Sequence, residues 1–173
     1  MLSFTTSWKY IKNNKPDEYS TDDVEKIAKN FKSDSTDKNS AKRKKMPNVI
    51  AIMNESLADL NVDGPFETSE DYLPFIHSLT KNTIKGKLYV SIEGANTANS
   101  EFEFLTGNSL AFFAPRAVPY NNYVKGVVPS LTRTLVSQGY MGNNSYHPYK
   151  RSGWNRENVY NSLGFNHFYS MEY

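Results

Sequence analysis

Three residues with chemically useful side chains follow segments that predict β-strands. Glu55 comes directly after a compact apolar run, Thr97 lies in the loop after a second predicted strand, and His147 follows a third. Ligands of open α/β sheets bind beyond the carboxyl ends of the strands. We therefore expect these three side chains to gather at one edge of a sheet.

Two of these residues have side chains suited to metal binding and nucleophilic chemistry. Glu55 offers the hard oxygen ligand that Mg²⁺ or Mn²⁺ prefers. Thr97 is expected at the N-cap of a helix, where unpaired N–H groups and the helix dipole favour an alkoxide or a phosphate oxygen. Each position also has a purely structural explanation: Glu55 could cap the next helix, and Thr97 could be an ordinary capping residue whose partner Glu101 closes a capping box.

The segment 146–156 concentrates basic and polar-tipped side chains. His147, Trp154 and Arg156 place an imidazole, an indole and a guanidinium close together in the sequence. This combination suits a substrate that carries phosphate and hydroxyl groups. The alternative is a surface loop that is anchored by an aromatic side chain.

Short apolar runs alternate with helical patterns, which predicts an α/β fold with a mostly parallel sheet flanked by helices. The run 48–53 has the continuous apolar character of a strand that is buried on both faces. Glycines that follow several helical patterns mark the expected helix ends. The predicted strands are 48–53, 87–91, 140–146 and 165–169; the predicted helices are 21–32, 72–79, 98–106, 130–138 and 154–163, and 108–127 is a long loop.

The first part of the chain is more basic and more polar than the rest. Residues 1–47 hold 11 Lys and Arg against 7 Asp and Glu, whereas the remainder holds 9 against 11. Ser20 predicts the N-cap of the helix over 21–32, and residues 33–46 have the low apolar content of a linker. We therefore expect a helical lead with a basic linker in residues 1–46 and a folded domain in residues 47–173.

Composition excludes several classes of protein. With 38% hydrophobic and 14% aromatic residues the chain can bury a core, so global disorder is excluded, and the absence of cysteine excludes thiolate chemistry. No apolar run has the length of a membrane span. A net charge of +2 is far from that of a dedicated nucleic-acid binder. The glycine-rich motifs of P-loop and dinucleotide-binding proteins and the serine-hydrolase motif are also missing.

Three segments together resemble the lipoteichoic acid synthase family, whose members are phosphoglycerol transferases of the alkaline phosphatase/sulfatase superfamily. Residues 47–56 (PNVIAIMNES) are similar to the family's opening strand, and residues 96–107 (NTANSEFEFLTG) are similar to its nucleophile segment. Residues 145–149 (SYHPY) and 154–160 (WNRENVY) resemble its substrate-pocket segment. The segments occur in the family's order, and residues 1–46 look like the lead that follows its membrane helices.

The resemblance implies a role for each candidate residue. Glu55 would bind a catalytic Mn²⁺ or Mg²⁺, and Thr97 would be the nucleophile with its hydroxyl on the same metal. Thr97 would attack phosphatidylglycerol, expel diacylglycerol and pass glycerophosphate to a glycerophosphate polymer or a cell-surface glycan. His147, Trp154 and Arg156 would hold the glycerophosphate head, with Arg156 able to pair bidentately with phosphate. The full-length protein would act at the extracellular face of the bacterial cell membrane.

The sequence departs from the family's metal site. The family completes this site with an Asp-His pair far downstream, whereas Ile76, Tyr146 and Asn166 precede the three histidines of this chain. The family's membrane helices are absent as well, and the chain stops among aromatic residues. We therefore expect the N-terminal part of an extracellular catalytic domain, with little or no activity by itself.

Two other functions stay open at this point. A sulfatase or phosphodiesterase could share the fold, although a sulfatase of this superfamily needs a Cys or Ser where Thr97 stands. A non-catalytic module that binds glycerophosphate or anionic glycans would also use the basic segment 146–156. Glu55 and Thr97 favour an enzymatic origin, whereas the missing metal ligands favour the binding module.

Overall fold

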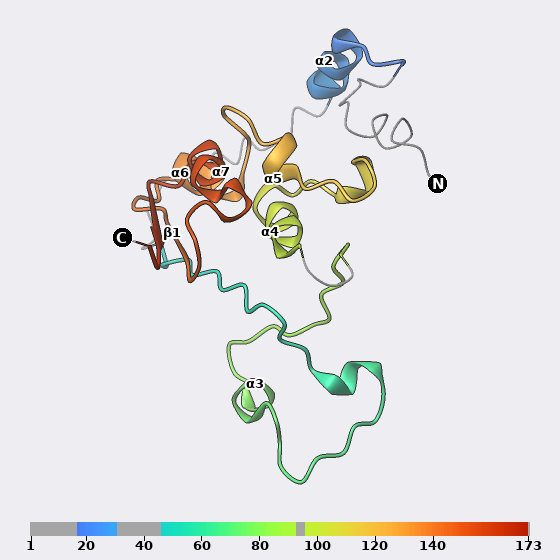
Figure 1. The fold of residues 1–173 in the computed structure, drawn as a ribbon, viewed down its shortest axis with the longest axis vertical. Coiled ribbons are helices and arrows are strands. Elements are labelled where there is room, and N and C mark those ends of the chain that lie inside the picture. The colour runs from blue at the N-terminus through green and yellow to red at the C-terminus, as the bar shows by residue number, and fades with distance from the viewer. Residues whose placement is uncertain (1–16, 31–45, 93–95, 173) are drawn as a thin grey trace. The chain divides into compact units, whose positions relative to one another are not determined.

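The computed structural model describes residues 17–30, 46–92 and 96–172 (Figure 1). The chain divides into two compact units, Met1–Ile52 and Met53–Tyr173. The first unit contains helix α2 (Thr21–Asn30), which confirms the predicted helix within the described residues. As predicted, the hydroxyl of Ser20 accepts a hydrogen bond from the N–H of Asp23 at 3.3 Å. The predicted linker lies almost wholly outside the described residues.

The second unit is built on α4 (Thr97–Thr106), α5 (Pro119–Asn122), α6 (Leu131–Ser137) and α7 (Arg156–Leu163), which pack around a small core (Figure 1). Gly107 and Gly164 end α4 and α7 in the left-handed conformation, as the sequence predicts. Ser130 caps α6 and donates a buried hydrogen bond to the carbonyl of Leu163 at 2.6 Å. The buried apolar residues are Ala98, Phe102, Leu105, Tyr120, Val124, Val159, Tyr160 and Leu163.

Two short parallel strands form the sheet of the described residues. Strand β1 (Asn144–His147) pairs with β2 (His167–Ser170), with Asn144 opposite His167. The connection between them runs through the 3₁₀ turn η3 (Gly153–Asn155) and α7, which makes a β–α–β unit. The predicted α/β class and the parallel pairing are therefore confirmed. His147 is the last residue of β1, so it lies at the carboxyl end where ligands of such sheets bind.

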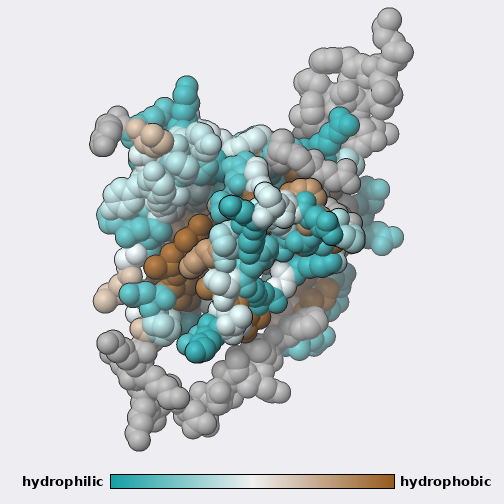
Figure 2. Space-filling view, turned by 90° about the horizontal axis from the view of Figure 1, so that it is seen from below, coloured by the Kyte–Doolittle hydropathy of each residue, from teal (hydrophilic) through white to brown (hydrophobic). Residues whose placement is uncertain are grey.

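Two of the predicted strands are wrong. Residues 48–53 and 87–91 form no ladder with any other described segment. Their apolar side chains are exposed, with Ile50 at 81% and Leu88 at 87%. A strand exists only through hydrogen bonds to a neighbour, and an apolar run alone does not supply one. Figure 2 shows hydrophobic surface exposed among polar side chains.

The remaining elements refine the predictions. The predicted strand 140–146 is shorter and later, because β1 covers only Asn144–His147. The predicted helix 72–79 is α3 (Pro74–Ser78), with Pro74 in its first turn as expected. The prediction of one long loop over 108–127 is wrong in part, because the 3₁₀ turn η2 (Leu110–Phe112) and the short helix α5 lie within it. Pro119, taken as a loop signal, fits the first turn of α5, where its missing N–H costs nothing. A further 3₁₀ turn is η1 (Leu60–Asp63). No helix in the described part of the chain has the length and hydropathy of a membrane span.

Candidate functional site

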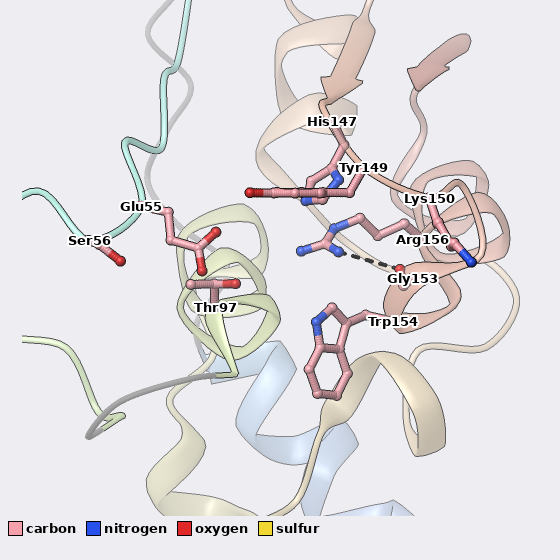
Figure 3. Close-up of a pocket in the computed structure, with 9 residues that line it drawn as sticks. All are labelled: Glu55, Ser56, Thr97, His147, Tyr149, Lys150, Gly153, Trp154 and Arg156. Atoms are coloured by element: carbon pink, nitrogen blue, oxygen red, sulfur yellow. Dashed lines mark hydrogen bonds between the residues drawn. The ribbon is translucent and has the colours of Figure 1, made fainter. Parts of the chain in front are cut away.

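All five candidate residues line one pocket of about 480 Å³ in the second unit (Figure 3). They come from four places in the sequence, so the chain fold rather than sequence proximity brings them together. Four further residues complete the lining, and of these Lys150 adds a second basic side chain. The lining residues are Glu55, Ser56, Thr97, His147, Tyr149, Lys150, Gly153, Trp154 and Arg156.

Glu55 reaches the pocket from a tight turn. The N–H of Leu57 donates to the carbonyl of Asn54 at 3.3 Å, and Ser56 has a positive φ of 61°. This turn ends the extended apolar run and projects the exposed Glu55 carboxylate. In Figure 3 that carboxylate points toward Thr97. No helix begins directly after Glu55, so the helix-capping alternative does not apply.

Thr97 is the first residue of α4, and its predicted place at the N-cap is wrong by one position. Asn96 is the N-cap, in the left-handed conformation (φ 55°), and its carbonyl accepts from the N–H of Asn99 at 2.8 Å. Asparagine tolerates this conformation better than threonine, because threonine is β-branched. The half-buried Thr97 hydroxyl therefore lies at the positive end of the helix dipole, where negative charge on oxygen is favoured.

The structural alternative for Thr97, a capping box closed by Glu101, does not apply, because Glu101 has other partners. Its carboxylate binds Arg156 and Tyr160 of α7. Sequence reasoning missed this contact, since Glu101 and Arg156 are 55 positions apart. The contact has no local sequence signal.

His147 lies at the wall of the pocket, in surroundings that favour its neutral form. Burial lowers its pKa, and the neighbouring positive charge of Arg156 lowers it further. The Nδ1 atom is buried and has no hydrogen-bond partner among the residues that the structure describes. A buried nitrogen without a partner is costly unless a ligand or water satisfies it. His147 is therefore suited to a hydrogen bond with a ligand hydroxyl or phosphate oxygen.

Arg156 is only 2% exposed, yet its guanidinium reaches the pocket. Its Nε and Nη2 both donate to Oε2 of Glu101, at 3.1 and 2.9 Å, and Nη1 donates to the carbonyl of Gly153 at 3.4 Å. Burial alone would lower the pKa of Arg156, but the Glu101 carboxylate raises it above its usual value. Arg156 therefore stays charged in a buried position.

Trp154 and Lys150 complete the basic wall. Trp154 has a left-handed backbone (φ 55°) in η3, which turns its half-exposed indole toward the pocket (Figure 3). Lys150 is exposed and lies in the same segment that the sequence marked as basic. Sequence reasoning did not single out Lys150, although that segment contains it. The wall therefore offers two cations, one neutral imidazole and one indole N–H.

The opposite wall offers hard oxygen donors. The Glu55 carboxylate and the Thr97 hydroxyl are ligands of the type that Mg²⁺ and Mn²⁺ accept. Within the described residues no group of three His, Asp or Glu side chains is arranged to hold a metal. The donor set therefore fits a hard divalent cation in chemical type, and this part of the chain offers two oxygen groups for it.

Comparison with known proteins adds a family and two relatives. The sulfatase family model matches residues 47–173. A protein of Rhizobium meliloti (strain 1021) named for cyclic beta-1,2-glucan modification is 36% identical over 126 residues, which are 73% of this chain and 19% of the relative. The crystal structure of the lipoteichoic acid synthase LtaP from Listeria monocytogenes is 26% identical, with a TM-score of 0.41 over 46% of this chain and 19% of that one. The chain spans about a fifth of the length of these relatives.

Proposed function

The chain belongs to the sulfatase family, and from that premise we propose that it supplies the nucleophile and the head-group site of a phosphoglycerol transferase. The reaction would move glycerophosphate from phosphatidylglycerol to a hydroxyl acceptor through a threonine intermediate. The observation that carries this proposal is the single pocket in which Glu55 and Thr97 face a basic wall containing His147 and Arg156.

The basic wall has the donors that a glycerophosphate head requires. Two N–H groups of Arg156 are not used in its hydrogen bonds to Glu101 and Gly153, and they can pair with two phosphate oxygens. Lys150 adds a positive charge near the rim. The neutral His147 and the indole N–H of Trp154 can bind glycerol hydroxyls.

Thr97 is the group placed to attack phosphorus. In the first step the bond from Thr97 Oγ1 to phosphorus forms while the bond from phosphorus to the diacylglycerol oxygen breaks. The threonine proton is lost and the departing oxygen takes up a proton, so diacylglycerol leaves as an alcohol. In the second step an acceptor hydroxyl loses its proton, attacks the same phosphorus and releases Thr97.

The superfamily is metal-dependent, and Glu55 and Thr97 are the residues that would hold Mn²⁺ or Mg²⁺ here. A bound divalent cation would lower the pKa of the Thr97 hydroxyl. The N-terminus of α4 favours the same ionised oxygen through its dipole. Glu55 would contribute one negative ligand to the site.

The acceptor and the location are further parts of the proposal. The resemblance to the lipoteichoic acid synthase family favours a glycerophosphate polymer, whereas the Rhizobium relative, named for glucan modification, favours a glycan. Phosphatidylglycerol lies in the membrane, and the resemblance to the lipoteichoic acid synthase family favours work at the outer face of that membrane. Residues 1–46 would be the juxtamembrane lead before the catalytic domain in residues 47–173.

Binding of the head group can be measured with Trp154. In a Trp8→Phe background the tryptophan emission reports only Trp154, and titration with glycerol 1-phosphate is expected to change it saturably. Lys150→Gln is expected to weaken binding, because Lys150 lines the pocket. Lys125→Gln is the matched control, since the exposed Lys125 lies elsewhere. If both variants bind glycerol 1-phosphate with the affinity of the parent chain, Lys150 does not contribute to the site.

Transfer is tested by intact-mass and peptide-mapping mass spectrometry after incubation with phosphatidylglycerol micelles and Mn²⁺. We expect one glycerophosphoryl group on Thr97 and no more than one equivalent of diacylglycerol, since two protein ligands hold a metal weakly. Thr97→Ala should abolish the adduct, and Ser100→Ala, on the next turn of α4, should keep it. Head-group binding without any adduct would instead support the non-catalytic binding module.

A further inference from the structure

The carboxylate of Glu101 lies between α4 and α7 and is fully engaged by donors from α7. Oε2 accepts from Nε and Nη2 of Arg156 at 3.1 and 2.9 Å, and Oε1 accepts from the hydroxyl of Tyr160. The side chains of Arg156 and Glu101 are 3% and 12% exposed. Glu101 does not line the pocket, so it can influence a bound ligand through Arg156 or through its charge but not by direct contact.

We propose that Glu101 is a positioning residue that fixes the guanidinium of Arg156 so that two parallel N–H groups face the bound phosphate. This inference rests on the proposed function of the pocket. Arginine has five N–H donors in a rigid planar fork. The hydrogen bonds to Glu101 and Gly153 use three of them and leave one on each terminal nitrogen.

The direction of the remaining donors follows from which nitrogens are engaged. Glu101 takes the side of the guanidinium that carries Nε and Nη2, and Gly153 takes a donor from Nη1. The end of the fork, between the two terminal nitrogens, therefore stays available. Figure 3 shows this end of Arg156 directed toward the wall that carries Glu55 and Thr97. That is the geometry in which arginine binds two oxygens of one phosphate.

A role of Glu101 in orienting Arg156 can be distinguished from an effect of its charge on the pocket. A negative carboxylate next to Arg156 reduces the positive potential that an anion feels in the pocket. If Glu101 acted only through its charge, its removal would strengthen phosphate binding. If Glu101 positions the fork, its removal weakens phosphate binding despite the gain in net positive charge. The two roles therefore predict changes of opposite sign.

The test is a titration of glycerol 1-phosphate by Trp154 fluorescence, in the full 173-residue chain with the Trp8→Phe background. Glu101→Gln keeps the size of the side chain and removes the charge, and we expect an affinity loss of about tenfold. Glu103→Gln is the matched control on the same helix, because Glu103 binds Ser91 and Leu110 instead. We expect the control to bind like the parent chain.

A double-mutant cycle tests whether Glu101 affects phosphate binding through Arg156. In an Arg156→Lys background the fork no longer exists, so adding Glu101→Gln is expected to cause little further loss. Tyr160→Phe removes one donor to Glu101 and leaves the ion pair, and we expect a smaller loss of about two- to threefold. This variant keeps the test decisive if circular dichroism shows that Glu101→Gln does not fold.

The outcomes separate this inference from the proposed function. If the parent chain binds glycerol 1-phosphate through Arg156 but Glu101→Gln and Tyr160→Phe bind as tightly or more tightly, the positioning role is overturned and the head-group site stands. Additive losses in the double-mutant cycle would also overturn it. If the parent chain does not bind glycerol 1-phosphate at all, the proposed head-group site itself fails.

Discussion

Thr97 and Arg156 are each the first residue of a helix, and both helices begin at the same pocket. Each follows an asparagine N-cap in the left-handed conformation, Asn96 with φ 55° and Asn155 with φ 57°. Neither asparagine side chain caps its helix. The nucleophile candidate and the phosphate-binding candidate therefore both lie where helix dipoles favour negative charge.

Glu55→Ala is predicted to remove most of the divalent-metal affinity of the chain. The carboxylate is the one charged ligand on its wall of the pocket, and the Thr97 hydroxyl alone holds a hard cation poorly. Calorimetric titration with Mn²⁺ should show weak binding by the parent chain and almost none by the variant. Glu67→Ala removes an exposed carboxylate elsewhere and should bind like the parent. Equal heats for all three proteins would exclude Glu55 as a ligand.

Arg156→Ala is predicted to destabilise the fold by about 3–5 kcal/mol, because it leaves the Glu101 carboxylate almost buried without its ion pair. Glu157→Ala, on the same helix as Arg156, breaks an exposed ion pair with Arg151 and should cost only about 0–1 kcal/mol. Urea unfolding followed by circular dichroism measures both. Similar unfolding midpoints for the two variants would show that the buried Arg156–Glu101 pair contributes no more to stability than the exposed Arg151–Glu157 pair.

His77 is predicted to make the segment around α3 sensitive to pH. Its Nδ1 contacts Asp71 at 2.7 Å and its Nε2 contacts Asp59 at 3.3 Å, and since carboxylates only accept, both nitrogens must carry protons. The hydrogen bond to Asp71 raises the pKa of His77 above its ordinary value of 6.5. This contribution to stability is fully present below pH 6.5 and is lost as the pH rises through the folded-state pKa.

Asp59 determines how the stability of the segment around α3 changes at low pH. The hydrogen bond from the Tyr72 hydroxyl lowers the pKa of Asp59 below 3.8, so its contribution is present above that pH and is lost as the pH falls through the lowered pKa. Amide exchange protection in α3, corrected for intrinsic rates, should therefore be highest between about pH 4 and 6.5. His77→Gln should abolish the decline at higher pH, and His167→Gln should retain it. An unchanged decline in His77→Gln would contradict this assignment.

Gly164→Ala is predicted to be more destabilising than Gly107→Ala, although both glycines end helices with positive φ. The conformational strain costs about 1–2 kcal/mol at either position. At Gly164 a Cβ would also lie 2.8 Å from Cγ of Arg133, whose guanidinium is held by the Ser162 carbonyl. This overlap should add about 1–3 kcal/mol. Equal unfolding midpoints would show that Arg133 moves aside freely.

Local signals in the sequence predicted each described α-helix except α5, which was taken as part of a loop. Gly107 and Gly164 act through their own backbone neighbourhood, so the rule for glycine after a helix located the C-terminal ends of α4 and α7. The cap formed by Ser130 at the start of α6 was not predicted. The apolar runs 48–53 and 87–91 carried no such local information. Their conversion into strands depends on partner strands, and composition cannot show whether a partner lies alongside.

The sequence predicted the residues that line the pocket, but it did not predict the ion pair that holds one of them in place. Glu55, Thr97 and His147 were expected at the carboxyl ends of three strands, and all three line the pocket. Only His147 ends a strand of the described residues, so the expected gathering was correct and the strand ends expected before Glu55 and Thr97 were not. The Glu101–Arg156 pair was missed because two helices must first pack to bring it together. Pairs that depend on packing between distant elements leave no periodic pattern in the sequence.

The β1–α7–β2 connection has a consequence for the order in which the molecule assembles. Asn144 and its partner His167 are separated by 23 positions, whereas Glu101 and Arg156 are separated by 55. Shorter loops cost less chain entropy to close, and contacts at short separation form sooner. We expect the β–α–β unit to form first and α4 to dock onto it afterwards. The wall of the pocket that carries His147 and Arg156 would then form first, and α4 would add Thr97 to it last.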